Sequence, residues 1–309
     1  MTAAFTGARL DRAGDGRRRD AAWLSAQRSD PRARAVHAGT RGVVMDGHRL
    51  ALHPLAGAGE PLLLGVGPGG PLFAVDLDAP APGGERAAPL IAAGGARGTG
   101  ASAPPPAHGP RPVGLREAVA VLPQDEGGLV AYVAALLNWH RRHGFCAACG
   151  TLTELAEGGL VRRCPRCATQ HHPRTDPVVI MLVTDADRVL LGRAPSWPPR
   201  RYSALAGFVE PGESLEEAVA REVEEETGVE IADLRYHGSQ PWPFPASLMV
   251  GFHARYAGGE AHAADAELED VRWFTRGELA AVVEGRTEFH VPPPAAIARR
   301  LIDEWLERA

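Results

Sequence analysis

The sequence predicts an α+β protein built from three successive parts. Short apolar runs separated by Gly and Pro at residues 41–77 indicate a β-rich N-terminal part. Four cysteines in two Cys-x2-Cys pairs at 146–167 indicate a small module held by a metal. A continuous apolar run at 177–183, followed by a helix of regular apolar spacing, indicates a C-terminal domain that mixes strands and helices.

The composition excludes several kinds of chemistry. All 33 basic residues of the 309-residue chain are arginine, so a Schiff base or a P-loop lysine is impossible. The net charge of -5 argues against broad, non-specific binding of nucleic acid. We find neither an apolar run near ~18 residues nor an apolar stretch behind Arg17–Arg19, so we expect no membrane span and a cytoplasmic protein.

The N-terminal domain is predicted to span residues 1–140. Residues 1–40 are polar and rich in arginine, without a clear period. The Pro/Gly/Ala-rich stretch at 78–113 is too poor in apolar surface to offset its ordering entropy, so we expect an extended, partly disordered insertion. From residue 115 to residue 140, apolar residues recur at steps of three and four, which predicts helix.

The cysteine module is predicted to span residues 141–172. Cys146 and Cys149 form one tight-turn pair, and Cys164 and Cys167 form the other. Two such turns can aim four thiolates at one point, which is the tetrahedral ligand set of a structural Zn²⁺. Two redox pairs or two disulfides are the alternatives, and the lack of a secretory signal disfavours disulfides.

The C-terminal domain, residues 173–309, contains a helix predicted at 215–227. Ser214 is a good N-cap, Glu217 completes a capping box with it, and Gly228 suits the C-terminal cap. Leucine, alanine and valine residues at helical spacing form the stripe expected to face the core.

Three glutamates of this helix converge on one face. Glu222, Glu225 and Glu226 stand at i, i+3 and i+4, where like charges repel. A hard divalent cation would turn that repulsion into binding and would assist attack of water on a phosphoryl group. A solvated acidic helix is the alternative interpretation.

The segment 207–229 resembles the Nudix box at every fixed position. These positions are Gly207, Glu213, Arg221, Glu222, Val223, Glu225, Glu226, Gly228 and Val229. The resemblance implies a Nudix α/β/α sandwich with a mixed sheet. It also implies that Mg²⁺ or Mn²⁺ is held by Glu222, Glu225, Glu226 and the carbonyl oxygen of Ala206. Arg221 would orient the glutamates and Glu213 would support the loop.

Residues 239–247 alternate prolines with aromatic residues. The prolines exclude helix and would hold Trp242 and Phe244 as rigid faces on which a nucleobase can stack. Alternatively, both aromatic rings fill the core. The residues of this segment that we expect to contact substrate are Gln240, Pro241, Trp242, Pro243, Phe244, Pro245, Ala246 and Ser247.

A zinc ribbon, a Nudix box and the array SQPWPFPxS together resemble the bacterial NADH pyrophosphatase (NudC) family over about residues 115–305. The resemblance implies hydrolysis of NADH or NAD⁺ to nicotinamide mononucleotide and AMP, and removal of NAD caps from RNA. It also implies a homodimer in which both protomers build the site. The N-terminal part fits the family only by its length and its β-rich character.

The resemblance assigns four further positions. Glu267 matches a glutamate that binds metal and assists catalysis. Phe208 matches an aromatic residue that stacks on the nicotinamide across the dimer. Ala298 matches a nucleotide-contacting position, although an amphipathic helix explains most of its segment. His172 departs from the family, because it stands where a tyrosine contacts substrate. A histidine in place of that tyrosine could alter the preference for the cap or the base. Zinc binding by this histidine is disfavoured because four thiolates already close the site.

Two other functions are open at this point. The same chemistry could act on ADP-ribose or a dinucleoside polyphosphate. A non-enzymatic nucleotide sensor or nucleic-acid binder could also use a zinc ribbon and an inactive Nudix domain, although the intact carboxylate set argues against it.

Overall fold

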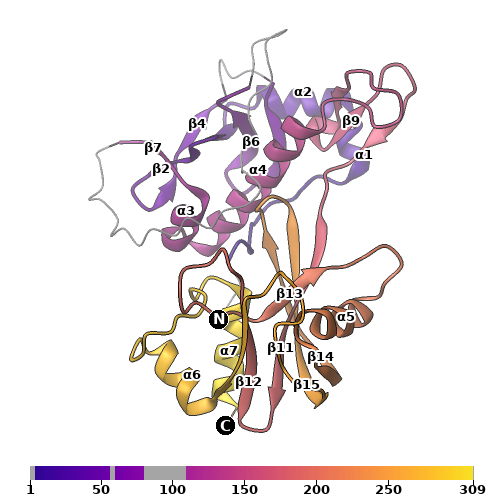
Figure 1. The fold of residues 1–309 in the computed structure, drawn as a ribbon. Helices are drawn as coiled ribbons and strands as arrows, with labels where there is room; N and C mark the ends of the chain where they lie inside the picture. The colour runs from indigo at the N-terminus through magenta and orange to yellow at the C-terminus, as the bar shows by residue number, and fades with distance from the viewer. Residues whose placement is uncertain (1–3, 56–59, 80–108, 309) are drawn as a thin grey trace.

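The computed structural model describes residues 4–55, 60–79 and 109–308, which form two lobes (Figure 1). The upper lobe in Figure 1 holds the N-terminal elements and the cysteine module, and the lower lobe holds the C-terminal elements. Among these residues, no helix combines the length and apolar character of a membrane-spanning segment. The mixture of sheets and helices confirms the predicted α+β class.

The N-terminal part is a mixed sheet backed by helices. Its sheet has the order β3-β2-β1-β6-β5, with β4 paired to β1, β7 paired to β2, and β1 parallel to β6. The elements are α1 (Asp15–Arg18), α2 (Ala21–Ser29), β1 (Arg34–Gly39), β2 (Gly42–Asp46), β3 (Arg49–Leu50), β4 (Leu52–Pro54), β5 (Leu62–Gly67), β6 (Gly70–Asp76), β7 (Arg111–Val113), α3 (Leu115–Val121) and α4 (Gln124–Arg142).

Two sequence expectations for this part change. Strand β1 lies in the middle of the sheet, although the polar stretch at 1–40 gave no period to predict it. Its buried residues Ala35, Val36 and Ala38, which lie on both faces of the sheet, are mostly small, which is why the apolar signal was weak. Most of the predicted insertion at 78–113 lies outside the described residues, but its last three residues form β7, an ordered strand paired with β2.

The cysteine module is a three-stranded sheet of order β10-β9-β8. Its elements are β8 (Glu154–Ala156), the 3-10 turn η1 (Glu157–Gly159), β9 (Val161–Arg163) and β10 (Gln170–His171). Arg18 ties the module to the N-terminal sheet. Its buried guanidinium donates to the carbonyl oxygens of Leu63, Leu64 and Glu157 at 3.0, 3.1 and 3.2 Å.

The C-terminal domain is a mixed sheet between two helical layers, with α5 on one side and α6 and α7 on the other (Figure 1). The strand order is β14-β15-β11-β12-β16, with β13 paired to β11 and with β11 parallel to β15. The elements are β11 (Asp176–Asp185), β12 (Arg188–Arg193), β13 (Leu205–Phe208), α5 (Leu215–Thr227), β14 (Glu230–Trp242), β15 (Ser247–Gly258), β16 (Asp270–Thr275), α6 (Arg276–Val283) and α7 (Ile297–Glu307).

Strand β11 is apolar on both faces because a helical layer covers each face. Val179 and Met181 pack on the α5 side, while Ile180 and Leu182 pack on the α7 side. Burying each such side chain contributes about 1.5–3 kcal/mol. The predicted helix at 215–227 is confirmed with its capping box, and Gly228 takes a left-handed φ of 68°.

Candidate active site

Arg221 is the centre of a carboxylate network at the end of β13 and on α5. Its Nε and Nη2 donate to the two oxygens of Glu213 at 2.6 and 2.9 Å. Its Nη1 donates to Glu222 at 2.9 Å and to Glu225 at 3.0 Å. The guanidinium also lowers the pKa of Glu213 to about 2, which keeps that carboxylate charged. One arginine therefore fixes three carboxylates, because a guanidinium presents several donors in a rigid fork.

Gly207 makes room for Glu222. A Cβ built on Gly207 would stand 1.8 to 2.0 Å from the carboxyl atoms of Glu222. The carboxyl group therefore packs directly against the backbone of β13, and any side chain at position 207 would displace it. The requirement for glycine at this fixed position of the motif therefore has a steric cause.

Glu226 is buried among other acids. It is 5% exposed, and its Oε2 has no hydrogen-bond partner. Burial and the charges of Glu222, Asp265 and Glu267 raise its pKa to about 8, against a hydrogen bond from the backbone of Ala206 that lowers it. An unpartnered buried oxygen beside other carboxylates fits a divalent cation, which supplies the missing charge.

The predicted catalytic glutamates do not all meet at one point. Glu225 is exposed and turns toward Arg221, and Glu267 lies exposed on the loop before β16, near enough to raise the pKa of Glu222 and Glu226. Among the described residues, two groups bring three or more candidate ligand atoms within 4.8 Å, and neither includes these glutamates. Glu222 and Glu226, with Ala206 beside them, therefore form the inner part of the site, and Glu225 and Glu267 form its rim.

The four cysteines gather into one site. The Sγ atoms of Cys149 and Cys164 are 3.5 Å apart, and those of Cys146 and Cys167 are 3.6 Å apart. Four ligands at about 2.3 Å from a tetrahedral Zn²⁺ would be roughly 3.8 Å apart, so the spacing fits that ion. All four are free thiols, which makes the disulfide alternative wrong. His171 stands 3.4 Å from the sulfur of Cys146, as an outer contact of the site.

The aromatic array packs against the upper lobe. The rings of Trp242 and Phe244 are 5.1 Å apart, and the buried ring of Phe5 meets each of them edge-on at 5.9 Å. The guanidinium of Arg116 lies 4.1 Å above the ring of Phe244. The alternative that the rings fill the core is confirmed in part, and stacking of a nucleobase on them stays a prediction. The rings contact the core, and Trp242 also lines a pocket of about 280 Å³ that includes Tyr132.

The side-chain amide of Gln240 makes internal hydrogen bonds, and the contact of this residue with substrate stays a prediction. The side chain is fully buried, its Nε2 donates to the carbonyl oxygens of Ala4 and Ala295, and its Oε1 accepts from the amide of Ile297 at 2.8 Å. The donors and the acceptor expected for substrate are thus used to join β14 to α7 and to the N-terminal segment.

The remaining predicted positions are scattered. Phe208 is 59% exposed at the end of β13, and His172 is exposed just after β10. Ser247 begins β15 opposite Trp242, where it is half-buried. The side chain of Ala298 is buried between α7 and the sheet, and the contact of this residue with a nucleotide stays a prediction.

The other members of the array surround these contacts. They are Pro241, Pro243, Pro245 and Ala246, of which all but Pro245 line the same pocket as Trp242. The carbonyl oxygen of Ala246 accepts from the amide of Asp176 at 2.8 Å, which fixes the turn to the start of β11.

Sequence reasoning missed two residues of this region. Asp265 accepts from the amides of Glu267 and Leu268 and so shapes the loop that carries Glu267. Aspartate side chains often accept a hydrogen bond from the backbone two residues later, so an aspartate two residues before Glu267 is a turn signal that could have indicated Asp265. Phe5 had no such signal, because its contacts with Trp242 and Phe244 cross most of the chain.

Three family models cover the chain in succession. An NADH pyrophosphatase-like rudimentary NUDIX domain matches residues 20–139, an NADH pyrophosphatase zinc ribbon domain matches residues 141–171, and a NUDIX domain matches residues 174–293. The first match shows that the N-terminal part is related to the family by more than its length. The second match supports a structural zinc at the four cysteines.

Curated relatives agree with these models. The NAD-capped RNA hydrolase NudC of Stutzerimonas stutzeri is 45% identical over 65% of this chain and 69% of its own length. NudC of Pseudomonas aeruginosa is 45% identical over 60% of this chain and 63% of its own length. The NAD-capped RNA hydrolase NUDT12 of Homo sapiens is 44% identical over 64% of this chain, and the matched segment covers 45% of the human protein. The chain belongs to the NudC family of Nudix hydrolases, the NADH pyrophosphatases that carry a zinc ribbon.

Proposed function

We propose that this chain hydrolyses the pyrophosphate bond of NADH or NAD⁺ to nicotinamide mononucleotide and AMP, and that it removes NAD caps from RNA 5′ ends. The observation that carries the proposal is the buried carboxylate of Glu226, whose Oε2 has no hydrogen-bond partner, within the Nudix carboxylate network. Relatives that are 45% and 44% identical to this chain are named NAD-capped RNA hydrolases.

The register of the sheet supports a shared site for the array and the glutamates. Along β11, Asp176 pairs with Ser247 of the array, and Val179 pairs with Gly207 beside the carboxylates. Three residues of strand correspond to about 10 Å. A nucleobase at the array and a pyrophosphate at the glutamates are compatible with this separation.

The residues divide the chemistry among them. A divalent cation, Mg²⁺ or Mn²⁺, would polarise the pyrophosphate and lower the pKa of bound water. Arg221 holds Glu222 and Glu225 in place through its guanidinium. Either Glu226 or Glu267 accepts the proton of the water whose oxygen attacks phosphorus, and the bridging oxygen leaves with the other nucleotide.

Arginine supplies the positive charge near the array. Arg116 lies over Phe244, and Arg201 is close enough to lower the pKa of Arg116, so two guanidiniums share this surface. They suit the phosphates of a dinucleotide or of a capped RNA end. The chain has no lysine to fill this role.

A homodimer is part of the proposal. Phe208 exposes a large apolar ring beside the carboxylate network, where a second protomer would cover it and where it could stack on a nicotinamide. Measurement of the molecular mass in solution, with and without Phe208→Ser, tests this arrangement.

A substrate comparison tests the proposed function. We expect kcat/KM to be highest for NADH, NAD⁺ or NAD-capped RNA with Mg²⁺ or Mn²⁺, and lower for ADP-ribose and dinucleoside polyphosphates. Preferred hydrolysis of either competitor would contradict the substrate assignment. Tight NADH binding without metal-dependent turnover would instead indicate a nucleotide sensor.

A further inference from the structure

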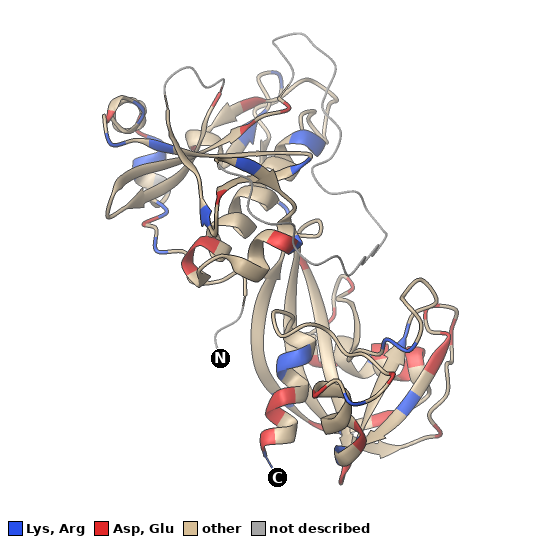
Figure 2. Ribbon diagram, turned by 90° about the vertical axis from the view of Figure 1, so that its left-hand side faces the viewer, with Lys and Arg blue, Asp and Glu red and all other residues tan. Residues whose placement is uncertain are grey.

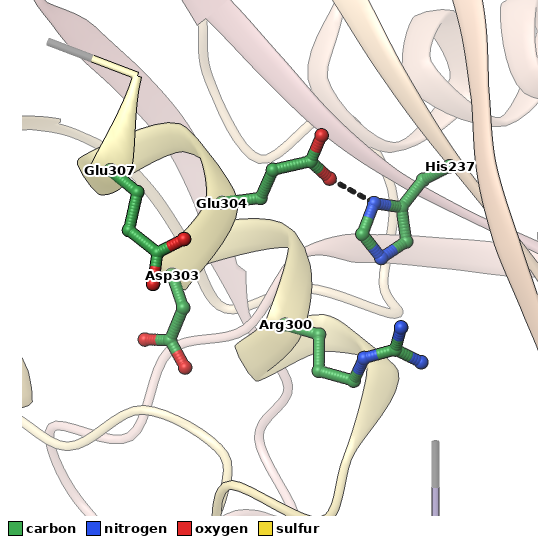
Figure 3. A pocket seen from close by; sticks show the side chains of 5 residues that line it. All are labelled: His237, Arg300, Asp303, Glu304 and Glu307. Atoms are coloured by element: carbon green, nitrogen blue, oxygen red, sulfur yellow. Dashed lines mark hydrogen bonds and ion pairs between the residues drawn. The ribbon is translucent and has the colours of Figure 1, made fainter. Parts of the chain in front are cut away.

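A histidine and carboxylate cluster lies on the face of the C-terminal sheet away from α5. The last turns of α7 cross β14 and β15 there, and a pocket of about 190 Å³ opens beside them (Figure 3). The residues that line it are His237, Arg300, Asp303, Glu304 and Glu307. Along α7, positive residues give way to acidic ones toward the C-terminus (Figure 2).

The two oxygens of Glu304 have different partners. Oε2 contacts Nδ1 of His237 and lies 3.2 Å from Nε2 of His253. Oε1 faces Arg235 at 3.4 Å and is paired with Arg308. The arginines therefore occupy one oxygen and leave the other to the two imidazoles.

The geometry of the three side chains fits a metal ion. One ligand atom from each of His237, His253 and Glu304 can be chosen so that all three lie within 4.8 Å of one another. Ligands at about 2.0–2.1 Å from a tetrahedral Zn²⁺ are roughly 3.3 Å apart. The contact of His253 Nε2 with the carboxylate is close to this at 3.2 Å, and the shorter contact of His237 Nδ1 would have to widen to admit the ion.

The state of the imidazoles also suits a cation. The side chains of His237 and His253 are 9% and 10% exposed, and burial lowers the pKa of both, that of His253 to about 4. Burial therefore disfavours the charged form of both rings, which is the form that cannot bind a metal. Nδ1 of His237 contacts the carboxylate of Glu304 and so carries the ring proton in the metal-free protein. A metal bound at Nδ1 would displace that proton to Nε2, which is buried without a hydrogen-bond partner.

We propose that His237, His253 and Glu304 bind a divalent transition-metal cation, with Zn²⁺ or Ni²⁺ as the chemical class. Two imidazole nitrogens select such ions over Mg²⁺, which takes oxygen ligands. His237 and Glu304 line the pocket beside this cluster, together with the acidic Asp303 and Glu307 and the basic Arg300.

The cation would fasten the C-terminal end of α7 to β14. The N-terminal end of α7 is already held by β14, because Ile297 donates to Gln240, which stands three residues after His237. The new site would therefore stabilise the strand that leads into the aromatic array, separately from the carboxylates on the other face of the sheet.

Nickel uptake by the full-length, zinc-loaded protein in excess Mg²⁺ tests the proposal. We expect the wild type to retain one more Ni²⁺ per chain than His253→Gln or Glu304→Gln, and to melt at a higher temperature with Ni²⁺ than without it. His48→Gln, which changes an exposed histidine elsewhere, serves as the matched control and should behave like the wild type.

A measurement on the wild type avoids dependence on the variants folding. Paramagnetic Ni²⁺ should broaden the imidazole resonances of His237 and His253 before those of His48. Equal uptake by the wild type and both variants, or broadening that spares His237 and His253, would overturn the site.

Discussion

The carboxyl group of Glu222 occupies the space next to Gly207 that a side chain would need, at 1.8 Å from an added Cβ. Gly207→Ala should therefore push Glu222 out of the network or shift β13, at a stability cost of about 1–3 kcal/mol typical of overpacking. NADH turnover should fall with it. Urea unfolding and kcat/KM measure the two effects.

The matched control for this change is Gly277→Ala. Gly277 lies in the first turn of α6 with open space around it, so an added methyl group meets nothing. Equal effects of the two substitutions would contradict the steric role of Gly207.

Arg221→Lys should lower kcat about 10- to 100-fold, the range typical of groups that orient metal ligands. An ammonium cannot reproduce the paired contacts with Glu213 while also holding Glu222 and Glu225. Steady-state kinetics with NADH measures the effect.

Arg255→Lys is the comparison for that change. The pair between Arg255 and Asp233 is solvent-exposed, and such pairs contribute about 0–1 kcal/mol. If both lysine variants kept full activity, Arg221 would not be organising the carboxylates.

The pKa of Glu226 predicts an unusual dependence of stability on pH. A folded-state pKa of about 8, above the ordinary value of 4.5, means that the folded protein holds a proton that the unfolded chain releases. The stability contributed by Glu226 is therefore complete below about pH 4.5 and is lost as pH rises through about 8. A bound divalent cation should remove this loss.

Urea unfolding of the wild type minus that of Glu226→Gln, from pH 5 to pH 9, isolates this dependence. Magnesium-free buffer is needed in place of a chelator, since a chelator would also strip the zinc ribbon. The raised pKa of Glu226 would be contradicted if the difference in unfolding free energy stayed constant with pH, or if it grew in favour of the wild type as pH rises.

Phe5→Ala should loosen the contact between the lobes. The ring of Phe5 is buried against Trp242 and Phe244, and removing such a ring costs about 3–5 kcal/mol. The array would be less rigid, so KM for NADH should rise more than kcat falls. Kinetics at a temperature where the variant remains folded separates the two, and an unchanged KM would show that the array does not need this support.

The sequence was most informative where the residues that predict an element and the residues that they contact lie in the same short segment. The helix at 215–227 has its caps, apolar stripe and glutamates within 16 residues, 214 to 229, and the structure places it with the predicted ends. The four cysteines likewise lie close together in the sequence, and the structure brings their sulfur atoms together. Residues such as Arg18 and Gln240 could not be placed, because their partners lie in other parts of the chain.

The same distinction applies at the predicted site. The resemblance assigns Gln240 and Ala298 to a nucleotide site, and only packing shows that the amide is used internally and that the methyl group is buried. Strand β1 was missed because small residues pack at the sheet centre without a strong apolar pattern.

The measurement that tests the central claim most directly is product analysis of NADH hydrolysis by Glu226→Gln beside Glu224→Gln. Both residues lie on α5, but Glu224 is exposed and Glu226 is buried in the carboxylate network. With Mg²⁺ or Mn²⁺, the wild type and Glu224→Gln should release nicotinamide mononucleotide and AMP, and Glu226→Gln should lose most of this activity. Hydrolysis by Glu226→Gln at the wild-type rate would contradict the account.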